Sequence, residues 1–143
     1  MIVNEIMTRD VQIISPEDSL QTAAQMMAVY DFGMVPVGEN DRLIGMLTDR
    51  DITTRAVARG LHPAQCKVGD IMSPEVNYVF DYESVDAAAR SMSNLQVRRL
   101  PVLNRDKRLV GIISLGDLAV TEPEPAADAL TSISQPETFE TRP

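Results

Sequence analysis

The sequence contains little of the chemistry that metal sites and covalent catalysis require. Its 143 residues include one cysteine, Cys66, and one histidine, His62. A single cysteine cannot form an intrachain disulfide, and a lone thiol more often fills space than reacts. A histidine-based metal site or a Ser-His triad lacks the side chains it needs. The composition therefore predicts no metal site and no catalytic residues.

Aromatic residues and long apolar runs are also scarce. Tryptophan is absent, and aromatic residues make up 4% of the chain. No run approaches the roughly 18 apolar residues that a membrane-spanning helix needs. The N-terminus lacks the basic and then apolar pattern of a signal peptide. We therefore expect a cytoplasmic protein that does not bind a membrane, with a core of Val, Ile, Leu, Met and Ala.

Basic residues are outnumbered, since 13 Lys and Arg face 21 Asp and Glu, for a net charge of −8. This balance argues against nucleic-acid binding, which needs a basic surface. Residues 121–143 hold five of the acidic residues and one arginine, together with four of the nine prolines. We expect an acidic, flexible tail over 121–143. The alternative is a short helix around 126–132 that binds a protein partner.

An internal repeat organises the rest of the chain. Shifting the sequence by 65 residues aligns 3–37 with 68–102 without a gap, and ten of these 35 positions are identical. After one inserted residue the shift becomes 66, and Gly45 then aligns with Gly111 and Asp51 with Asp117. This is a duplication. It divides the chain into a first copy over 1–66, a second copy over 67–120 and the tail.

Both copies carry the same order of secondary-structure signals. Strand-like runs at 11–14 and 76–80 precede Ser19 and Ser84, which suit helix N-caps. The apolar spacing after each serine predicts one buried helical stripe, formed by Leu20, Ala23, Ala24, Met27 and Ala28 in the first copy and Val85, Ala88, Ala89 and Met92 in the second. Gly33 suits the C-terminus of the first of these helices. Strands at 35–37, 43–48, 100–102 and 109–114 and a helix at 49–59, stopped by Gly60, complete the pattern.

Each copy is therefore predicted to be a β-α-β-β-α unit of mixed α/β (α+β) class. One unit is too small to bury its apolar helix face alone, so we expect the two copies to pack together.

Several short motifs, in order and present twice, resemble the CBS family, whose motifs pair as a Bateman module. They are Asp-Ile-Met at 70–72, Arg-Leu-Pro-Val at 99–102, and the closing runs Gly-Met-Leu-Thr-Asp-Arg-Asp at 45–51 and Gly-Ile-Ile-Ser-Leu-Gly-Asp at 111–117. The resemblance covers about residues 3–120 and is closest to the stand-alone CBS-pair proteins of prokaryotes. It implies tandem motifs packed with pseudo-twofold symmetry, two clefts between them, and a homodimer.

The closing runs pair a hydroxyl with a carboxylate three residues later, as Thr48 with Asp51 and Ser114 with Asp117. A carboxylate can accept hydrogen bonds from both hydroxyls of a ribose, and the start of a helix favours an anion. The resemblance assigns ribose contact to Asp51 and Asp117, assisted by Thr48 and Ser114. The alternative is purely structural, because the same spacing fits a helix capping box.

The resemblance also implies which residues share a cleft. One cleft combines Thr48 and Asp51 with Val76, Asn77 and Arg98, and the other combines Ser114 and Asp117 with Val11, Gln12 and Gly33. Arginine has a planar fork of donors that suits phosphate, so the cleft with Arg98 is predicted to bind phosphate-bearing nucleotides better, unless Arg99 or Arg50 reaches across to the other cleft. The alternative is that Arg98 and Arg99 pair with surface acids. Adenine is expected beside apolar residues of the strands and of the segments before each proline, which include Val35, Met46, Val97 and Ile112, although Met46 and Ile112 also suit the core.

The sequence thus predicts a regulatory module that senses AMP, ADP or ATP, with NAD and S-adenosylmethionine as further adenosyl candidates. It needs no cofactor and is not an enzyme. The alternative function is a protein-interaction scaffold in which the clefts are vestigial.

Overall fold

The computed structural model describes residues 1–121 and 123–135. Contacts between residues divide it into two compact units, and each is described by itself. The first-repeat unit comprises Asp10–Asn77 and Asp106–Leu109. The second-repeat unit comprises Met1–Arg9, Tyr78–Arg105 and the described residues from Val110 onward. Among the described residues, no helix is long and apolar enough to cross a membrane.

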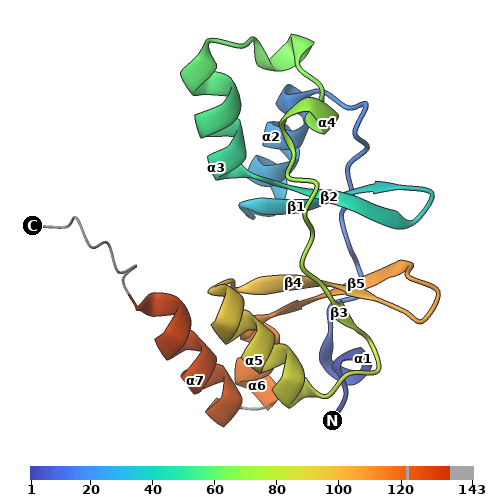
Figure 1. Ribbon diagram of the computed structural model, residues 1–143, viewed down its shortest axis with the longest axis vertical. Helices are drawn as coiled ribbons and strands as arrows, with labels where there is room; N and C mark the ends of the chain where they lie inside the picture. Colours follow the sequence, from blue (N-terminus) through green and yellow to red (C-terminus); the bar gives the residue numbers. More distant parts are fainter. Residues whose placement is uncertain (122, 136–143) are drawn as a thin grey trace, which may run out of the picture. The chain divides into compact units, whose positions relative to one another are not determined.

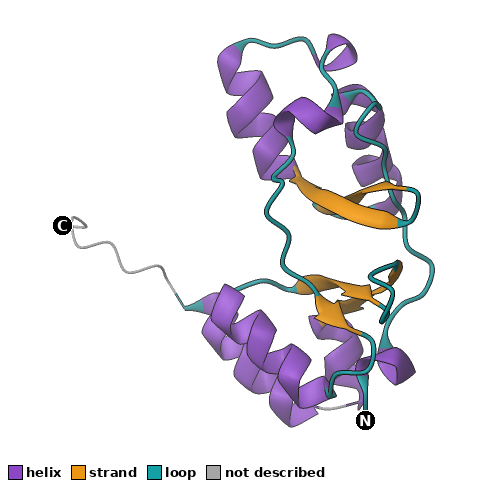
Figure 2. Cartoon of the chain, turned by 45° about the vertical axis from the view of Figure 1, so that its right-hand side comes forward, coloured by secondary structure: helices purple, strands orange, loops and turns teal. Residues whose placement is uncertain are grey.

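The first-repeat unit is a two-stranded antiparallel sheet with helices on one side (Figure 2). Its strands are β1 (Met34–Glu39) and β2 (Arg42–Thr48), and Pro36 lies opposite Met46. The helices and turns are α2 (Leu20–Tyr30), α3 (Asp49–Asp51), a π-helical turn (Ile52–Ala56), two 3-10 turns (Val57–Arg59 and Pro63–Gln65) and α4 (Val68–Ile71). Gly60 ends the second helical segment with φ of 72°, as the sequence predicted.

The second-repeat unit has a three-stranded sheet in the order β3-β4-β5, with α5, α6 and α7 on one side (Figure 1). The strands are β3 (Val79–Phe80), β4 (Arg99–Leu103) and β5 (Leu109–Ser114), and β3 pairs with β4 in parallel. The helices are α1 (Val3–Ile6), α5 (Val85–Leu95), α6 (Leu115–Thr121) and α7 (Pro123–Ser134). The mixed α/β class with two similar units agrees with the prediction.

The first strand of each repeat is shorter than predicted. In the first repeat, only Ile14 of 11–14 pairs, through an isolated parallel bridge to Val37. The Ile14 amide donates to the carbonyl of Pro36 at 3.0 Å, and the Gly38 amide donates to the carbonyl of Ile14 at 3.0 Å. Pro36 has no amide hydrogen, and this pairing needs only its carbonyl as an acceptor.

The predicted helix starts are confirmed. The Ser19 hydroxyl accepts a hydrogen bond from the Thr22 amide at 3.1 Å, and the Ser84 hydroxyl accepts one from the Ala87 amide at 3.0 Å. Satisfying these otherwise unpaired amides stabilises each helix by about 1 kcal/mol.

The predicted helix end at Gly33 is wrong. Helix α2 ends at Asp31, which adopts the left-handed conformation with φ of 55°, and α5 ends at Gln96 with φ of 54°. Gly33 lies beyond the cap, where a Cβ atom would come within 2.9 Å of the Asp49 carboxylate. Gly33 therefore allows close approach to the next helix and does not end the preceding one.

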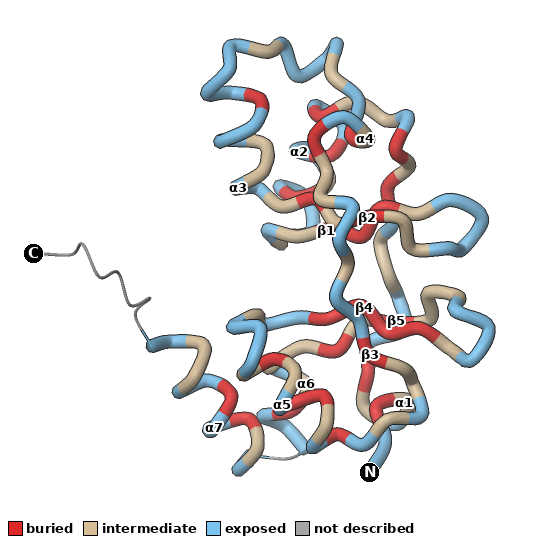
Figure 3. The backbone as a smooth tube through the Cα atoms, viewed as in Figure 1, coloured by how far each residue is buried: buried red, intermediate tan, exposed pale blue. Residues whose placement is uncertain are grey.

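The apolar stripes of the helices form part of the core of each unit. Figure 3 shows that buried residues recur along the helices and strands of both units. In α5 all four predicted positions, Val85, Ala88, Ala89 and Met92, are buried. In α2 only Leu20, Ala23 and Met27 are buried, whereas Ala24 and Ala28 are exposed. The predicted stripe of α2 was therefore too wide.

The two compact units do not coincide with the two copies of the repeat, whose predicted division lies at residue 66. Residues 1–9 of the first copy belong to the second-repeat unit, and residues 67–77 of the second copy belong to the first-repeat unit. The Thr8 amide donates to the Ile112 carbonyl at 2.8 Å, and the Met46 amide donates to the Ser73 carbonyl at 2.9 Å. The two copies thus exchange their N-terminal segments, which a repeat alignment cannot show.

The predicted flexible tail is wrong for residues 123–134, which form α7. Ala126 and Ala129 are buried, and the Gln96 side-chain amide donates to the Ser132 carbonyl at 3.1 Å. Small side chains let α7 pack closely, and Pro123 suits the first turn of a helix. The alternative of a helix at 126–132 agrees with this structure, although the helix packs on its own unit. Residues 136–143 of the predicted tail lie outside the described residues.

The exchanged segments make a stability prediction at Gly111. A Cβ atom there would lie 2.6 Å from the Met7 sulfur and 2.9 Å from the Thr8 carbonyl oxygen. We expect Gly111→Ala to destabilise the protein by about 1–3 kcal/mol because the backbone must shift. Urea unfolding measures this change.

Gly116→Ala is the matched control, since a Cβ atom there would only contact the Ser114 hydroxyl at 3.6 Å. It should retain or slightly raise stability, because alanine is favoured over glycine in helices. Equal stability of the two variants would contradict the close approach.

Candidate functional site

Each hydroxyl–carboxylate pair forms a reciprocal capping box. The Thr48 hydroxyl accepts from the Asp51 amide at 3.0 Å, and the Asp51 carboxylate accepts from the Thr48 amide at 3.0 Å. The corresponding distances between Ser114 and Asp117 are 3.1 and 3.0 Å. The structural alternative for this motif is therefore present in both units. The hydroxyl and carboxylate side chains of each pair accept hydrogen bonds from backbone amides at the start of the helix. The sequence had predicted that an anion binds such amides.

The second oxygen of each carboxylate has a further neighbour, which is Thr8 of the exchanged segment for Asp117 and Arg55 for Asp51. Asp117 accepts from the Thr8 hydroxyl at 3.3 and 3.4 Å, distances that are long for a hydroxyl donor. Asp51 lies 3.8 Å from the Nε of Arg55, whose guanidinium donates to the Ser73 hydroxyl at 3.3 Å. Asp117 therefore contacts a hydroxyl-bearing residue of the other repeat directly, and Asp51 is linked to one through Arg55.

Thr8, Ser73 and Arg55 were missed by the sequence interpretation. The repeat alignment pairs Thr8 with Ser73, so both copies carry a hydroxyl directly after the Ile-Met dipeptide. That recurrence was the available signal. Arg55 has no such signal, because its position matters only once the segments have exchanged.

Arg98 and Arg99 lie beside Ser114 in the second-repeat unit. The Leu115 amide donates to the Arg98 carbonyl at 2.8 Å, and the Asp49 amide donates to the Gly33 carbonyl at 2.9 Å in the equivalent place of the first-repeat unit. Residues before each Pro-Val pair therefore contact the closing motif of their own repeat. The prediction had grouped Arg98 with Thr48 and Asp51, and Gly33 with Ser114 and Asp117.

Both arginine side chains are exposed, and neither guanidinium forms an ion pair or a hydrogen bond within residues 1–121 and 123–135. The alternative that they pair with surface acids therefore has no support in the described part of the chain. Two adjacent unpaired cations attract an anion, and guanidinium groups match the oxygens of a phosphate.

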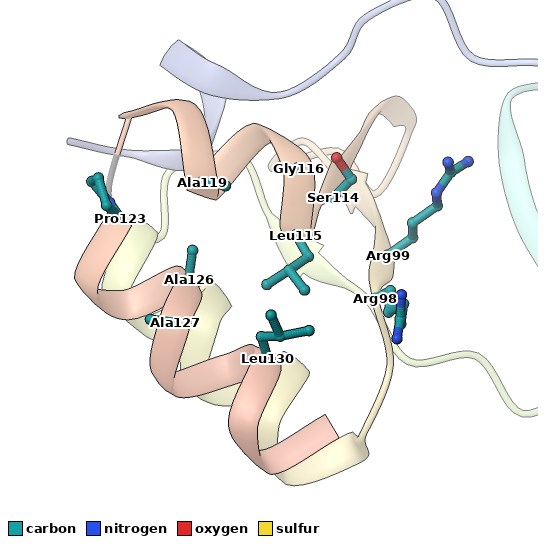
Figure 4. Close-up of a pocket in the computed structure, with 10 residues that line it drawn as sticks. All are labelled: Arg98, Arg99, Ser114, Leu115, Gly116, Ala119, Pro123, Ala126, Ala127 and Leu130. Carbon is teal, nitrogen blue, oxygen red and sulfur yellow. The ribbon is translucent and has the colours of Figure 1, made fainter. Parts of the chain in front are cut away.

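A cavity of about 540 Å³ lies next to these arginines. It is formed by the start of β4, the end of β5, α6 and α7 (Figure 4), and its lining residues are Arg98, Arg99, Ser114, Leu115, Gly116, Ala119, Pro123, Ala126, Ala127 and Leu130. Leu115 and Leu130 point toward one another in Figure 4. The cavity is therefore largely apolar, with a polar edge made by Ser114 and the two arginines.

The remaining predicted contacts lie in several environments. The first-repeat unit contains Val11, Gln12, Val76 and Asn77, as well as Thr48 and Asp51. Asn77 is exposed, and Val11, Gln12 and Val76 are half-buried. Two candidates for contact with adenine pack in cores. Val35 is completely buried, which argues against its contact with a ligand, and Val97 packs against the core of the second-repeat unit.

The other two adenine candidates, Met46 and Ile112, are half-buried on β2 and β5. Among the described residues, no three histidine, cysteine or acidic side chains gather where they could hold a metal ion.

Comparison with known proteins identifies the class. The model of the CBS domain matches residues 3–57 and 68–124. The chain belongs to the CBS domain family and contains two tandem CBS motifs. This confirms the resemblance and the duplication that the sequence predicted.

Three similar proteins cover most of the chain. The CBS domain-containing protein YhcV of Bacillus subtilis is 42% identical over 134 residues, which are 92% of this chain and 94% of YhcV. A crystal structure of Hypoxic Response Protein I with two coordinated zinc ions is 37% identical, with a TM-score of 0.77 over 86% of this chain and all of that one. A crystal structure of CBSX2 in complex with AMP is 25% identical, with a TM-score of 0.72 over 86% and 96% of the two chains.

The capping box predicts a stability change that does not involve a ligand. Ser114→Ala removes the acceptor for the Asp117 amide, so we expect a loss of about 0.5–2 kcal/mol. Thermal unfolding of the ligand-free protein measures it. Ser134→Ala is the control, because Ser134 is exposed at the end of α7. If both variants unfold at the wild-type temperature, the capping contact contributes nothing and this account of Ser114 is wrong.

Proposed function

We propose that this CBS-domain protein is a regulatory module that binds a phosphate-bearing adenine nucleotide, such as AMP, ADP or ATP. The observation that carries the proposal is the pair of arginines, Arg98 and Arg99, beside Ser114 at the edge of an apolar cavity. Their guanidinium groups have no ion-pair or hydrogen-bond partner among the described residues. A cationic edge beside an apolar cavity complements a molecule with a phosphate and a flat aromatic base whose two faces pack on apolar side chains. The AMP held by the structurally similar CBSX2 supports this choice.

The carboxylates can serve a ligand while they cap a helix. An ionised carboxylate has about four lone-pair positions, and the capping bond from the backbone of Thr48 or Ser114 occupies one of them. The long contact with Thr8 leaves further capacity on Asp117. We assign the ribose hydroxyls to Asp51 and Asp117, with Thr48 and Ser114 holding each carboxylate in place.

The two units are not equivalent toward phosphate. Where the second-repeat unit has Arg98 and Arg99, the first-repeat unit has Gly33 and Met34. We therefore propose that a phosphate-bearing ligand prefers the second-repeat unit. An uncharged adenosyl group suits the first-repeat unit, where Val11, Gln12, Val76 and Asn77 remain candidate contacts.

We propose binding and not catalysis, because the paired carboxylates are already held by backbone amides.

A cytoplasmic homodimer remains part of the proposal. Exposed apolar side chains such as Val29 and Tyr30 on α2, with 75% and 52% of their surface accessible, suit an interface between copies.

A protein-interaction scaffold is the second candidate, and one observation favours it. Both hydroxyl–carboxylate pairs have a complete structural role as capping boxes without any ligand. The two functions differ in a thermal-shift assay, because a ligand that binds only the folded state raises the melting temperature. No shift with AMP, ADP, ATP, NAD or S-adenosylmethionine would favour the scaffold.

The nucleotide proposal makes a quantitative prediction at Arg98. Removing a charge-assisted hydrogen bond to phosphate costs about 1.5–3 kcal/mol, so Arg98→Ala should weaken AMP binding about 10-fold to 100-fold. Isothermal titration calorimetry measures the affinity. Arg59→Ala is the matched control, since Arg59 is an exposed arginine of the first-repeat unit. Equal affinities of the two variants for AMP would remove Arg98 from the site.

A further inference from the structure

Helix α7 forms one wall of the cavity beside Arg98. Four of its residues line the cavity, namely Pro123, Ala126, Ala127 and Leu130. The match to the CBS domain ends at residue 124, so most of α7 lies outside the family pattern. The wall is therefore formed mostly by residues that lie beyond the second CBS motif.

The wall is held in place without a ligand. Ala126 and Ala129 are buried, Ile133 packs against the core, and the Gln96 side chain donates to the Ser132 carbonyl. Because these contacts fix α7 against its unit, the cavity is preformed. A ligand then does not have to order the helix before it binds.

The size and lining of the cavity fit the base of a nucleotide. Its volume of about 540 Å³ lies within the range of small-molecule sites. Leu115 and Leu130 approach one another across it, and the alanines of α6 and α7 leave space between them (Figure 4). A flat, largely apolar ring fits between such side chains. A phosphate does not, because it would lose its hydration there.

The charged edge determines the orientation of the ligand. Arg98 and Arg99 stand at the β4 side of the cavity, and Arg99 points away from the two leucines (Figure 4). The net charge of the chain is −8, so this cationic edge differs from the general charge of the molecule. It complements an anionic group attached to the ring.

We infer that α7 completes the nucleotide site of the second-repeat unit, with the base in the apolar cavity against α7 and the phosphate at Arg98 and Arg99. This inference rests on the proposed function and adds the part of the chain that recognises the base. The first-repeat unit offers no such wall among the described residues, because its chain passes from α3 into short π-helical and 3-10 turns.

The experiment fills the cavity from an exposed position. Ala127 lines the cavity and is exposed, so Ala127→Phe can occupy the space of the base without disturbing the core. Ala28→Phe is the matched control, because Ala28 is an exposed alanine of α2 in the first-repeat unit. The full-length variants are titrated with AMP and with ribose 5-phosphate, which has the phosphate but no base.

We expect Ala127→Phe to weaken AMP binding about tenfold or more and to leave ribose 5-phosphate binding unchanged. Ala28→Phe should bind both as the wild type does. Leu130→Glu is a second variant. It puts a carboxylate into the cavity, and a bound base would remove water from that carboxylate at a cost in free energy. This variant should therefore also weaken the binding of AMP but not that of ribose 5-phosphate.

Two results overturn the inference in distinguishable ways. If Ala127→Phe and Leu130→Glu bind AMP as tightly as the wild type while Arg98→Ala binds it weakly, α7 does not contact the base and the proposed function stands. If the wild type binds neither AMP nor ribose 5-phosphate, the proposed function itself fails, and this site with it.

Discussion

The exchange of N-terminal segments between the two repeats is the contact on which the rest of the structure depends. Thr8 pairs with Ile112 of β5 through two backbone hydrogen bonds of 2.8 and 2.9 Å, and Ser73 pairs with Met46 of β2 through two of 2.9 Å. Both pairings require a glycine in the strand, because the sulfur of Met7 or Met72 occupies the space of a Cβ atom at Gly111 or Gly45. Neither repeat supplies a complete unit alone.

The exchange also arranges the candidate site. It places a hydroxyl from one repeat beside the closing carboxylate of the other, directly for Asp117 and through Arg55 for Asp51. The capping boxes hold these carboxylates in equivalent positions in both units. The duplication therefore preserved the carboxylate geometry, while the residues before each proline diverged. Cationic side chains and the wall of α7 are found together only in the second-repeat unit of the described structure.

Much of the fold could be predicted from local signals. The serine caps, the buried stripe of α5 and the β-strands around Pro36 and Pro101 depend on residues close in sequence. The exchange could not be predicted, because a repeat alignment shows which residues correspond and not which repeat they contact. The docking of α7 was missed because its buried side chains are alanines, whose small apolar area gives a weak periodic signal.

The candidate site was predicted in part. The hydroxyl–carboxylate pairs follow from spacing alone, and spacing also suggested the capping box that the structure contains. The grouping of Arg98 with Thr48 and Asp51 stays a prediction, and the structure adds a backbone contact that spacing did not suggest, between the Arg98 carbonyl and the amide of Leu115 in its own repeat. Val35 was predicted to contact adenine. Which face of the sheet a strand residue lies on depends on the pairing register, and the sequence of a short strand does not determine that register.

Hydrogen–deuterium exchange of the full-length protein with and without saturating AMP tests the central claim most directly. The account predicts slower exchange at residues 98–99 and 114–118 and in α7 when AMP is present, because the nucleotide joins these elements. Unchanged exchange in all three segments, with AMP shown to be bound, would contradict it and place the nucleotide elsewhere on the protein.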